Sequence, residues 1–563
     1  MPGNDSAREA EVRSILQLAL PPARRLWAAI ALGALSGGSA VALLAVSAWL
    51  ITRASEQPAL VYVSMAVVGV RAFALGRAFF RYLERLTGHD AAFRQLAVIR
   101  SELFSRLVPL APDGLGDTRR GDLLSSVTDD VDELQNHSLR VVQPLVTAGV
   151  IAIGSVVGVF LLLPQAGVAL LVTLAAAFVF GSLANSWLSA TAERGIAPLR
   201  AELNDGILDL VTNLDVLTAF DALPGAQKRV TAAGGRLTAA LRSRASGAGL
   251  TAAVVSVLAG AATLFAVLAG VPALSAGRLD APALAVVALL PLAVFELFGT
   301  VPLALGARRQ VRASAERLAA IASPEPPAGI PADSPHPVGL VVTGVPAVEL
   351  DGLSSNWPGT TADVLSDVTL TLAPGERVVL TGPTGAGKTA LAHVLTRFLD
   401  YRGSLRIAGV EARNARQDDV RAVIGLCEQQ PYLFDSDLRQ NLLFARETAT
   451  DEDLLAVLDR VGLGEWAAAR GGLDAPVGER GALVSGGQAQ RIALARAILA
   501  GFPVLVVDEP TANVDAAVGE RIVLDILTTA AEDGRTVLLI SHTPVPDALV
   551  TRRLQLEDGH LGA

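Results

Sequence analysis

Six long apolar runs in the first half of the chain constrain its fold more than any other feature. They lie at about 26–50, 59–80, 140–163, 166–188, 248–270 and 281–305. A helix of roughly 20 apolar residues is long enough to cross the hydrocarbon core of a membrane. With 51% hydrophobic and only 18% charged residues, the 563-residue chain is too apolar for a soluble protein of its length. We therefore expect a membrane domain of six transmembrane helices over residues 1–320.

Arginine is unevenly distributed over the connections between these runs. The connections at about 81–139 and 189–247 are long and rich in arginine, whereas those at 51–58, 164–165 and 271–280 are short and nearly free of it. Positively charged connections stay on the cytoplasmic side. We therefore expect a multi-pass protein of the cytoplasmic (inner) membrane, with the N-terminus, both long connections and everything after residue 306 in the cytoplasm. The polar N-terminus does not have the pattern of a cleaved signal peptide.

The net charge and the single cysteine argue against other classes of site. A formal net charge of −9 does not indicate a nucleic-acid surface, so no nucleic-acid partner is expected. Cys427 has no second cysteine with which to form an intrachain disulfide or a cysteine-only zinc site.

The two long connections are expected to continue the flanking membrane helices into the cytoplasm. Each would end in a short turn or cross-helix, and amphipathic stretches at 121–127 and 209–214 mark the two tips. Their apolar residues would dock on a cytoplasmic partner domain and transmit its motion. The alternative is an ordinary solvated hairpin tip.

Charged residues also occur inside the apolar runs. Four basic residues recur every four positions along the second run and its extension: Arg77, Arg81, Arg85 and His89. A step of four residues drifts by only about 40°, so they share one slowly rotating helix face. Charges within a membrane helix avoid lipid and face partners or a water-filled path, so this basic face would suit an anionic cargo. Alternatively, the arginines nearest the cytoplasm extend to the phosphates of the inner leaflet. Glu296, midway along the sixth run, either lines the path of such a cargo or neutralises the charge of an arginine such as Arg71.

A proline-rich linker at 321–337 precedes a domain of ordinary globular composition at 338–563. This domain contains a glycine-rich stretch between a β-rich run at 377–381 and a helical pattern at 390–399. The stretch consists of Gly382, Pro383, Thr384, Gly385, Ala386, Gly387, Lys388 and Thr389. Its context is typical of a phosphate-binding loop, in which backbone N–H groups and a helix N-terminus surround a polyphosphate. Lys388 can reach the β- and γ-phosphates, and the Thr389 hydroxyl can ligate Mg²⁺.

Further candidate residues follow in the order that an ATP-driven domain requires. Trp357 is placed to stack on adenine, although a tryptophan near a turn is usually part of the packing. Gln429 would bind Mg²⁺ or the attacking water. A buried strand at 504–508 ends in Asp508, which would hold Mg²⁺, and is followed by Glu509, which would polarise the water that attacks the γ-phosphorus. His542, after a strand at 536–540, would hydrogen-bond the γ-phosphate.

A second anion site is expected at the start of a helix at 489–499. It consists of Ser485, Gly486, Gly487 and Gln488, whose backbone amides lie at a helix N-terminus. The site is too remote in sequence to share the first phosphate loop easily. Residues 512–515 follow the paired carboxylates and would couple one nucleotide site to another.

These motifs carry a family resemblance. Residues 338–563 resemble the nucleotide-binding domain of ATP-binding cassette (ABC) transporters, with Walker A, Q-loop, signature, Walker B, D-loop and H-loop motifs; Val484 stands where leucine is usual in the signature. The first half resembles a type IV exporter half-transporter. The fold implied is an α-helical membrane domain followed by an α/β P-loop domain, with ATP and Mg²⁺ as cofactors. In that family two cassettes enclose two ATP molecules, so the chain would dimerise and its signature would contact the partner's ATP.

The segment at 81–94 permits a narrower comparison. It reads Arg-Tyr-Leu-Glu-Arg-Leu-Thr-Gly-His-Asp-Ala-Ala-Phe-Arg and is similar to the characteristic segment of the CydC family, half of the CydDC heterodimer required for cytochrome bd assembly. The resemblance implies a CydD-like partner, surrounding membrane lipid and a small anionic cargo, either haem or the thiols cysteine and glutathione. If haem b is the cargo or a ligand, His89 is the candidate axial ligand, with Arg81 and Arg85 near its propionates. Otherwise His89 is a helix-surface histidine near the inner leaflet.

Two other functions remain open from the sequence. A drug- or lipid-exporting half-transporter would have the same architecture. An ATP-gated membrane protein would use nucleotide only as a ligand, but Asp508 and Glu509 argue against it, because a gate that needs no hydrolysis needs no catalytic base.

Overall fold

The computed structural model describes residues 2–115, 123, 126–321, 327–511, 516–542 and 544–562. The chain forms two compact units. The first comprises Met1–Ser105 and Arg119–Ser323, and the second comprises Arg106–Thr118 and Pro324–Ala563. The segment Arg106–Thr118 therefore belongs to the second unit, although it follows the second apolar run in the sequence.

The first unit is helical, and six of its segments are long and apolar enough to cross a membrane. The expected six-span membrane half is thus present. The elements from the N-terminus to the linker are α1 (Pro2–Leu18), α2 (Ala23–Ser55), α3 (Leu60–Leu107), η1 (Val108–Leu110), η2 (Ser126–Asp130), α5 (Val131–Leu134), η3 (His137–Val142), α6 (Gln143–Leu162), α7 (Pro164–Thr212), α8 (Leu214–Ala219), α9 (Leu223–Ser275), α10 (Ala281–Phe298) and α11 (Thr300–Ile321).

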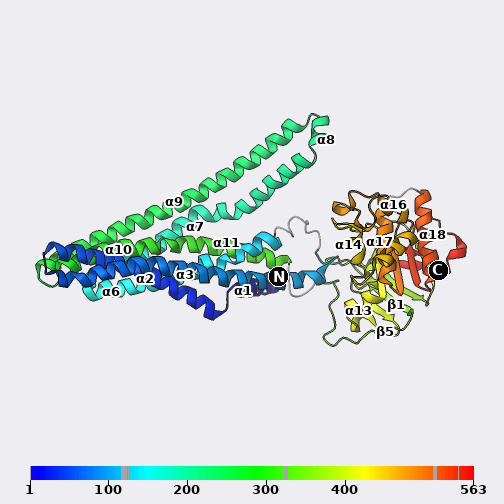
Figure 1. Ribbon diagram of the computed structural model, residues 1–563, viewed down its shortest axis with the longest axis horizontal. Coiled ribbons are helices and arrows are strands. Elements are labelled where there is room, and N and C mark those ends of the chain that lie inside the picture. The colour runs from blue at the N-terminus through cyan, green and yellow to red at the C-terminus, as the bar shows by residue number, and fades with distance from the viewer. Residues whose placement is uncertain are drawn as a thin grey trace. The chain divides into compact units, whose positions relative to one another are not determined.

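Small residues line the packed part of the membrane helices. Helices α7 and α9 lie side by side (Figure 1). The buried core of the unit includes Ala177 on α7 and Ala259, Ala262 and Ala266 on α9. Such residues let helix backbones approach closely, which matters in a membrane because lipid supplies no hydrophobic driving force between helices.

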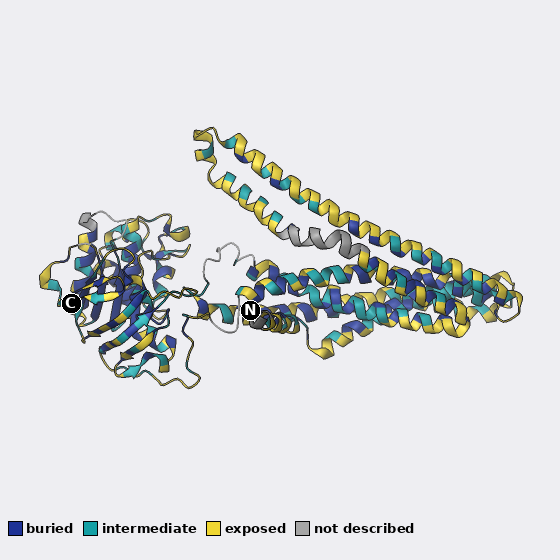
Figure 2. Cartoon of the chain, turned by 180° about the vertical axis from the view of Figure 1, so that it is seen from behind, coloured by how far each residue is buried: buried dark blue, intermediate teal, exposed yellow. Residues whose placement is uncertain are grey.

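The second long connection has the expected helical extensions. Helices α7 and α9 continue past their apolar segments, and the short α8 joins them at the tip (Figure 1). The predicted stretch 209–214 covers the end of α7 and the start of α8. The tip is largely exposed (Figure 2), and Phe220 next to α8 is 81% exposed. The other predicted tip, 121–127, lies mostly outside the described residues.

Two membrane segments depart from the continuous helices that the sequence predicts. The sixth run, expected as one helix over 281–305, breaks at Gly299 into α10 and α11. The segment before α6 contains two π-helical stretches, η2 and η3. Arg317 on α11 donates to both carboxylate oxygens of Asp130 in η2 and thereby ties these regions together. π-Helical turns are rare in proteins, and those that occur often lie at functional sites.

The second unit contains two sheets. An antiparallel sheet has the order β2-β1-β4-β5, and a six-stranded sheet has the order β10-β9-β3-β8-β7-β6, in which β9, β3, β8, β7 and β6 are parallel. The strands are β1 (Val348–Ser355), β2 (Leu365–Leu372), β3 (Arg377–Thr381), β4 (Arg402–Ile407), β5 (Val410–Glu411), β6 (Ile424–Cys427), β7 (Val504–Asp508), β8 (Thr536–Ile540), β9 (Arg552–Glu557) and β10 (His560–Gly562). The carboxyl ends of the parallel strands meet at one edge, the usual position of ligand sites in such sheets.

Helices and short turns connect these strands. They are α12 (Lys388–Leu395), η4 (Ala412–Asn414), α13 (Gln417–Val423), α14 (Leu438–Leu443), α15 (Asp451–Arg460), α16 (Gly464–Ala468), η5 (Gly472–Asp474), η6 (Glu479–Gly481), α17 (Gly486–Ala500), α18 (Ala516–Glu532) and η7 (Asp547–Leu549). Two helices differ from the predicted bounds. Helix α12 begins at Lys388 and ends four residues before the predicted end at 399, and α17 begins at Gly486 instead of 489.

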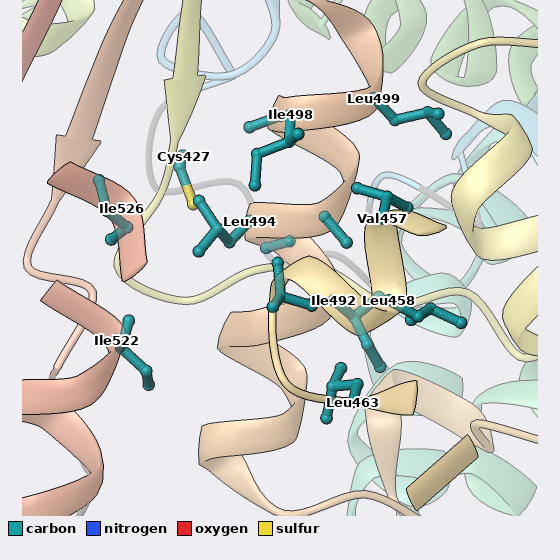
Figure 3. Packing of buried hydrophobic residues seen from close by; sticks show 14 of the residues in the cluster. Cys427, Val457, Leu458, Leu463, Ile492, Leu494, Ile498, Leu499, Ile522 and Ile526 are labelled. Atoms are coloured by element: carbon teal, nitrogen blue, oxygen red, sulfur yellow. The ribbon is translucent and has the colours of Figure 1, made fainter. Parts of the chain in front are cut away.

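Two apolar cores support the second unit. One lies between the antiparallel sheet, β3 and α12. In the other, Ile492, Leu494 and Ile498 of α17 pack near Ile526 of α18 and Cys427 of β6 (Figure 3). Burial raises the pKa of the Cys427 thiol to about 12, so the thiol stays protonated and unreactive.

A buried arginine holds the linker against the second unit. Arg397 is 1% exposed and donates to the backbone carbonyls of Ala412 (2.9 Å), Ala415 (3.0 Å) and Ala332 (3.1 Å). Gln417 adds a second tie, since its backbone N–H donates to Asp333 and its side chain to the carbonyl of Pro331. The end of the linker is therefore part of the packed domain.

Replacing Arg397 with alanine is expected to lower the apparent Tm of the full-length chain. The buried carbonyls of Ala412 and Ala415 and the partly buried carbonyl of Ala332 would lose their donor, at a cost of about 3 kcal/mol in the free energy of unfolding. Arg402→Ala is the matched control, because Arg402 is 61% exposed and its ion pair with Asp363 contributes about 1 kcal/mol or less. Equal Tm losses in the two variants, measured by thermal shift in detergent, would contradict this account of Arg397.

Candidate nucleotide site and membrane cavity

The phosphate loop leaves β3 and enters α12 in a conformation that excludes side chains at two glycines. A Cβ atom on Gly382 would lie 2.1 Å from the carbonyl oxygen of Leu556, and one on Gly387 would lie 2.6 Å from that of Val364. Both neighbours are backbone atoms and cannot move aside easily. Gly387 also has a φ of 101°, which favours glycine. The sequence therefore needs glycine here for the loop to turn over the sheet edge.

Lys388 and Thr389, the first residues of α12, point to the end of the sheet. The Lys388 ammonium is almost fully buried and donates to the carbonyls of Gly382 (2.9 Å) and Pro383 (3.0 Å). The Thr389 hydroxyl donates to Oδ2 of Asp508 over 2.8 Å. The predicted phosphate-binding lysine and the two predicted Mg²⁺ ligands are therefore neighbours.

Asp508 has an electrostatic environment that suits a cation. Its Oδ1 is buried and has no hydrogen-bond partner. Burial raises the pKa of its carboxyl, the Thr389 hydrogen bond opposes this shift, and the nearby charge of Glu509 adds to it. A buried carboxylate oxygen without a partner is costly. The hard oxygen donors of Asp508 and Thr389 fit Mg²⁺, which would relieve this cost.

Glu509 is the centre of a cluster that draws on four parts of the chain. Its Oε2 accepts from the Gln429 side chain (3.0 Å), and its Oε1 lies 3.0 Å from Nε2 of His542 and 3.8 Å from the Lys388 ammonium. Glu509 has a φ of 45°, a left-handed conformation that costs a non-glycine residue about 1 kcal/mol or more. Strained residues of this kind cluster at active sites.

The second predicted anion site is formed as a capped helix N-terminus. Ser485 accepts from the backbone N–H of Gln488, whose side chain accepts in return from the backbone N–H of Ser485. Ser485 and Gly486 are exposed, Gly487 follows them in the first turn of α17, and among the described residues no hydrogen bond joins this segment to the phosphate loop. Farther along α17, Gln490 donates to the backbone carbonyl of Gln429 and so positions the Q-loop.

Trp357 lies beside the phosphate-loop helix. It packs against the core between the antiparallel sheet and α12, and its ring meets the edge of His393 at 5.7 Å. Nδ1 of His393 in turn lies 2.6 Å from Oδ2 of Asp113, in the segment Arg106–Thr118. The sequence analysis missed this chain of contacts, because nothing local to Asp113 or His393 marks them as partners. Residues 512–515, the predicted D-loop, lie outside the described residues.

The first unit contains a cavity of about 630 Å³ that receives the predicted basic face. Arg77, Arg81, Arg85 and His89 all line it, and the ring of His89 lies 5.9 Å from that of Phe93, also at the cavity. The remaining lining residues are Gly33, Ser36, Gly37, Ala40, Glu84, Gln135, Asn136, Leu139, Arg140, Gln143, Pro144, Thr147, Ala148, Glu296, Leu297 and Thr300. Within the described chain, Arg81, Arg85 and Arg140 form no salt bridge.

Glu296 has a different partner from the one suggested by the sequence. Its Oε1 lies 3.3 Å from Nη2 of Arg77, not near Arg71, and both side chains of the pair line the cavity. Glu296 therefore pairs with an arginine, as one of the two expected alternatives has it, and lines the cavity; that this cavity is the path of a cargo stays a prediction. The prediction of Arg71 was wrong because the partner depends on the rotation of α10 against α3, which the sequence alone does not reveal.

The residues of η3 and its neighbours that also line the cavity were not predicted from the sequence. Arg140 belongs to the π-helical η3, and Gln135, Asn136 and Gln143 flank it. An arginine at the edge of the predicted span 140–163 was the available signal. The position of Arg140 in the sequence did not show that it lies in a π-helical segment and lines the same cavity as Arg77, Arg81 and Arg85.

Two protein families match the chain. The ABC transporter transmembrane region matches residues 14–296, and the ABC transporter family matches residues 365–512. The chain is 30% identical to the glutathione/L-cysteine transport system ATP-binding/permease protein CydC of Escherichia coli (strain K12), over 90% of this chain and 87% of the relative. It is 27% identical to the CydD protein of the glutathione/L-cysteine transport system of Bacillus subtilis (strain 168), over 92% and 90%.

A solved structure has the same fold. It is that of a bacterial Atm1-family ABC exporter with ATP bound, with a TM-score of 0.76 and 22% identity over 96% of this chain and 94% of that one. At this identity the likeness concerns the fold alone. The expected fold, a six-span helical domain followed by an α/β P-loop domain, is confirmed.

Gly382→Ala is expected to abolish high-affinity nucleotide binding, because the new methyl group would collide with the Leu556 carbonyl and displace the phosphate loop. The shift in apparent Tm on adding ATP without hydrolysis measures this loss. Gly409→Ala is the control, since Gly409 also has a positive φ (78°) but has open space around its Cα. A normal ATP-induced shift in Gly382→Ala would refute the steric argument.

Proposed function

Because this chain belongs to the ABC transporter family, we propose that it is the CydC-like half of a heterodimeric exporter for a small thiol such as glutathione or cysteine. It is a multi-pass membrane protein that couples the hydrolysis of ATP, with Mg²⁺, to transport. The proposed site is the cytoplasmic membrane, and the proposed role is support of cytochrome bd assembly. The thiol proposal is supported by the transport system to which the CydC relative belongs and by one observation, the arginine-lined cavity.

The proposed nucleotide chemistry follows from the cluster at the sheet edge. On ATP binding, Lys388 would exchange the loop carbonyls of Gly382 and Pro383 for phosphate oxygens. Thr389 and Asp508 would hold Mg²⁺, which neutralises charge on the phosphates, and Gln429 is close enough to contribute. Trp357 is the proposed adenine contact.

Glu509 is the proposed catalytic base. Its carboxylate is already oriented by Gln429 and His542, two groups that would also face the γ-phosphate. A carboxylate held on both oxygens keeps its direction toward the attacking water, which favours proton transfer. His542 would then stabilise the charge that develops on the transferred phosphoryl group.

A second chain is proposed to complete each nucleotide site. In the Ser485–Gln488 segment the N–H groups of Ser485 and Gln488 are used in the capping box, whereas those of Gly486 and Gly487 lie in the first turn of α17, where N–H groups have no acceptor within the helix. These groups suit the γ-phosphate of ATP held by a partner. A CydD-like partner is proposed because relatives named CydC and CydD both align along this chain.

Coupling to the membrane half is proposed to run through Asp113 and His393. The His393 side chain contacts Trp357 on one side and Asp113 on the other, and both members of the His–Asp pair are largely buried. Asp113 belongs to the connection that follows the second span. Movement of α12 during nucleotide binding would therefore pull on that connection directly.

The cargo proposal rests on the charge of the membrane cavity. Arg81, Arg85 and Arg140 face it without forming salt bridges within the described chain, and polar amides line it as well. Guanidinium groups bind carboxylates through paired hydrogen bonds. A small anionic molecule is thus a better match than a lipid or an uncharged hydrophobic drug, which would leave these guanidinium groups without a partner.

Haem is the second candidate cargo or ligand, and one observation favours it. His89 stands at the cavity beside Phe93, on the same helix face as Arg81 and Arg85. A neutral imidazole is suited to iron, and arginines to propionates.

Glu509→Gln in the assembled dimer should retain ATP binding and lose ATP hydrolysis by roughly a hundredfold, the usual size of a general-base contribution. Phosphate release measures the hydrolysis, and the ATP-induced Tm shift measures binding. Glu532→Gln is the control, because Glu532 is exposed at the end of α18. Ordinary hydrolysis in Glu509→Gln would count against the assigned base.

The thiol proposal predicts ATP-dependent uptake of labelled glutathione by inside-out vesicles that contain this chain and its co-expressed partner. Uptake should be absent in Glu509→Gln vesicles, because accumulation needs hydrolysis. Vesicles that hydrolyse ATP but take up no thiol would refute the proposal. A Soret band in the purified complex that disappears in His89→Ala would then favour haem, and stimulation of ATP hydrolysis by hydrophobic drugs or lipids would favour the rival exporters.

A further inference from the structure

The membrane cavity holds carboxylates as well as arginines, and these carboxylates bear on the chemistry of the cargo. Arg77, Arg81 and Arg85 line it from α3, which also carries Glu84, and it is further lined by Arg140 from η3 and Glu296 from α10. A carboxylate within a membrane segment is costly and usually has a function. A site built only for a dianion would bind more tightly without Glu84 and Glu296, because like charges repel. Their presence indicates a cargo that also carries a positive charge.

The Arg77–Glu296 ion pair has the geometry of an exchangeable contact. It consists of a single hydrogen bond of 3.3 Å, longer than the roughly 2.7–2.9 Å of strong charge-assisted bonds. The Arg77 side chain is 41% exposed and that of Glu296 is 66% exposed. Exposed pairs of this kind contribute little stability. The two groups can therefore separate at small cost when another pair of charges replaces them.

We propose that Arg77 and Glu296 together recognise the α-amino-acid end of the cargo, a carboxylate and an ammonium on one carbon. The cargo carboxylate takes the place of Glu296 at Arg77, and the cargo ammonium takes the place of Arg77 at Glu296. Each separated charge gains a new partner of the opposite sign, so neither charge is left without a partner. The inference rests on the thiol function proposed above and narrows its substrate class.

The remaining arginines extend this recognition to a second acidic group. Arg81 and Arg85 follow Arg77 on the same face of α3, and Arg140 faces the cavity from η3. They are available for another carboxylate at a distance from the first. Glutathione has an α-amino-acid end and a separate glycyl carboxylate, whereas haem has two propionates and no ammonium. The charge pattern therefore favours the tripeptide thiol.

The test compares uptake of glutathione and N-acetylglutathione by inside-out vesicles that contain the full chain with its co-expressed partner. Acetylation removes the ammonium and keeps both carboxylates and the thiol. S-methylglutathione controls for added bulk, because it keeps the ammonium. The wild-type protein is expected to prefer glutathione over the N-acetyl form by roughly tenfold or more, the size of one hydrogen bond to a charged group, and to accept the S-methyl form.

Glu296→Gln is expected to bring the ratio of glutathione to N-acetylglutathione uptake close to one, and Glu296→Asp to restore part of the preference. Glu202→Gln is the control: it removes a carboxylate that pairs with Arg236 and does not line the cavity, and it should keep the preference. The wild-type comparison of substrates stands even if a variant does not fold.

Three results would overturn the inference while leaving thiol export in place. They are equal wild-type uptake of glutathione and its N-acetyl form, a proportionate loss of both in Glu296→Gln, and loss of the preference in Glu202→Gln as well. A proportionate loss would mean that the ion pair only holds α3 against α10. Absence of uptake of every thiol by vesicles that hydrolyse ATP would instead remove the proposed function, and the inference with it.

Discussion

Parallel pairing of β3, β8, β7 and β6 is the constraint on which the nucleotide site depends. Each strand ends at the same sheet edge and delivers one group there: the phosphate loop after β3, His542 after β8, Asp508 and Glu509 at the end of β7, and Gln429 after β6. The strands are short and buried, so their backbone hydrogen bonds leave little freedom in register. A slip of one residue would move every group away from the phosphate loop.

The same sheet edge contains three energetically unfavourable features that a bound ligand would relieve. Glu509 is held in a left-handed conformation, Asp508 has a buried oxygen without a partner, and the Lys388 ammonium bonds to loop carbonyls. Natural structures tolerate such features when the surrounding fold holds them in place and a ligand uses them. The two apolar cores on either side of the parallel sheet supply that support.

In the membrane half, several charged side chains likewise gather at one site. Four of its arginines and two of its glutamates line one cavity formed by α2, α3, η3, α6, α10 and α11. Small residues elsewhere in the bundle allow close packing without polar groups. Polar side chains therefore reach this cavity both from the continuous helix α3 and from the π-helical η3.

Much of this organisation was predictable from the sequence. Six apolar runs, the linker and the strand–loop–helix context of Gly382–Thr389 are encoded by neighbouring residues, since hydrophobic length and turn chemistry act locally. The identities of Asp508, Glu509, Gln429 and His542 as candidates followed from their order along the chain. What only the tertiary structure decided is which distant side chains meet: Glu296 with Arg77 instead of Arg71, Arg140 with the basic face of α3, and Asp113 with His393. These contacts depend on helix rotation, π-helical phase shifts and the break at Gly299, and such angles are set by packing between segments far apart in sequence, which no local pattern records.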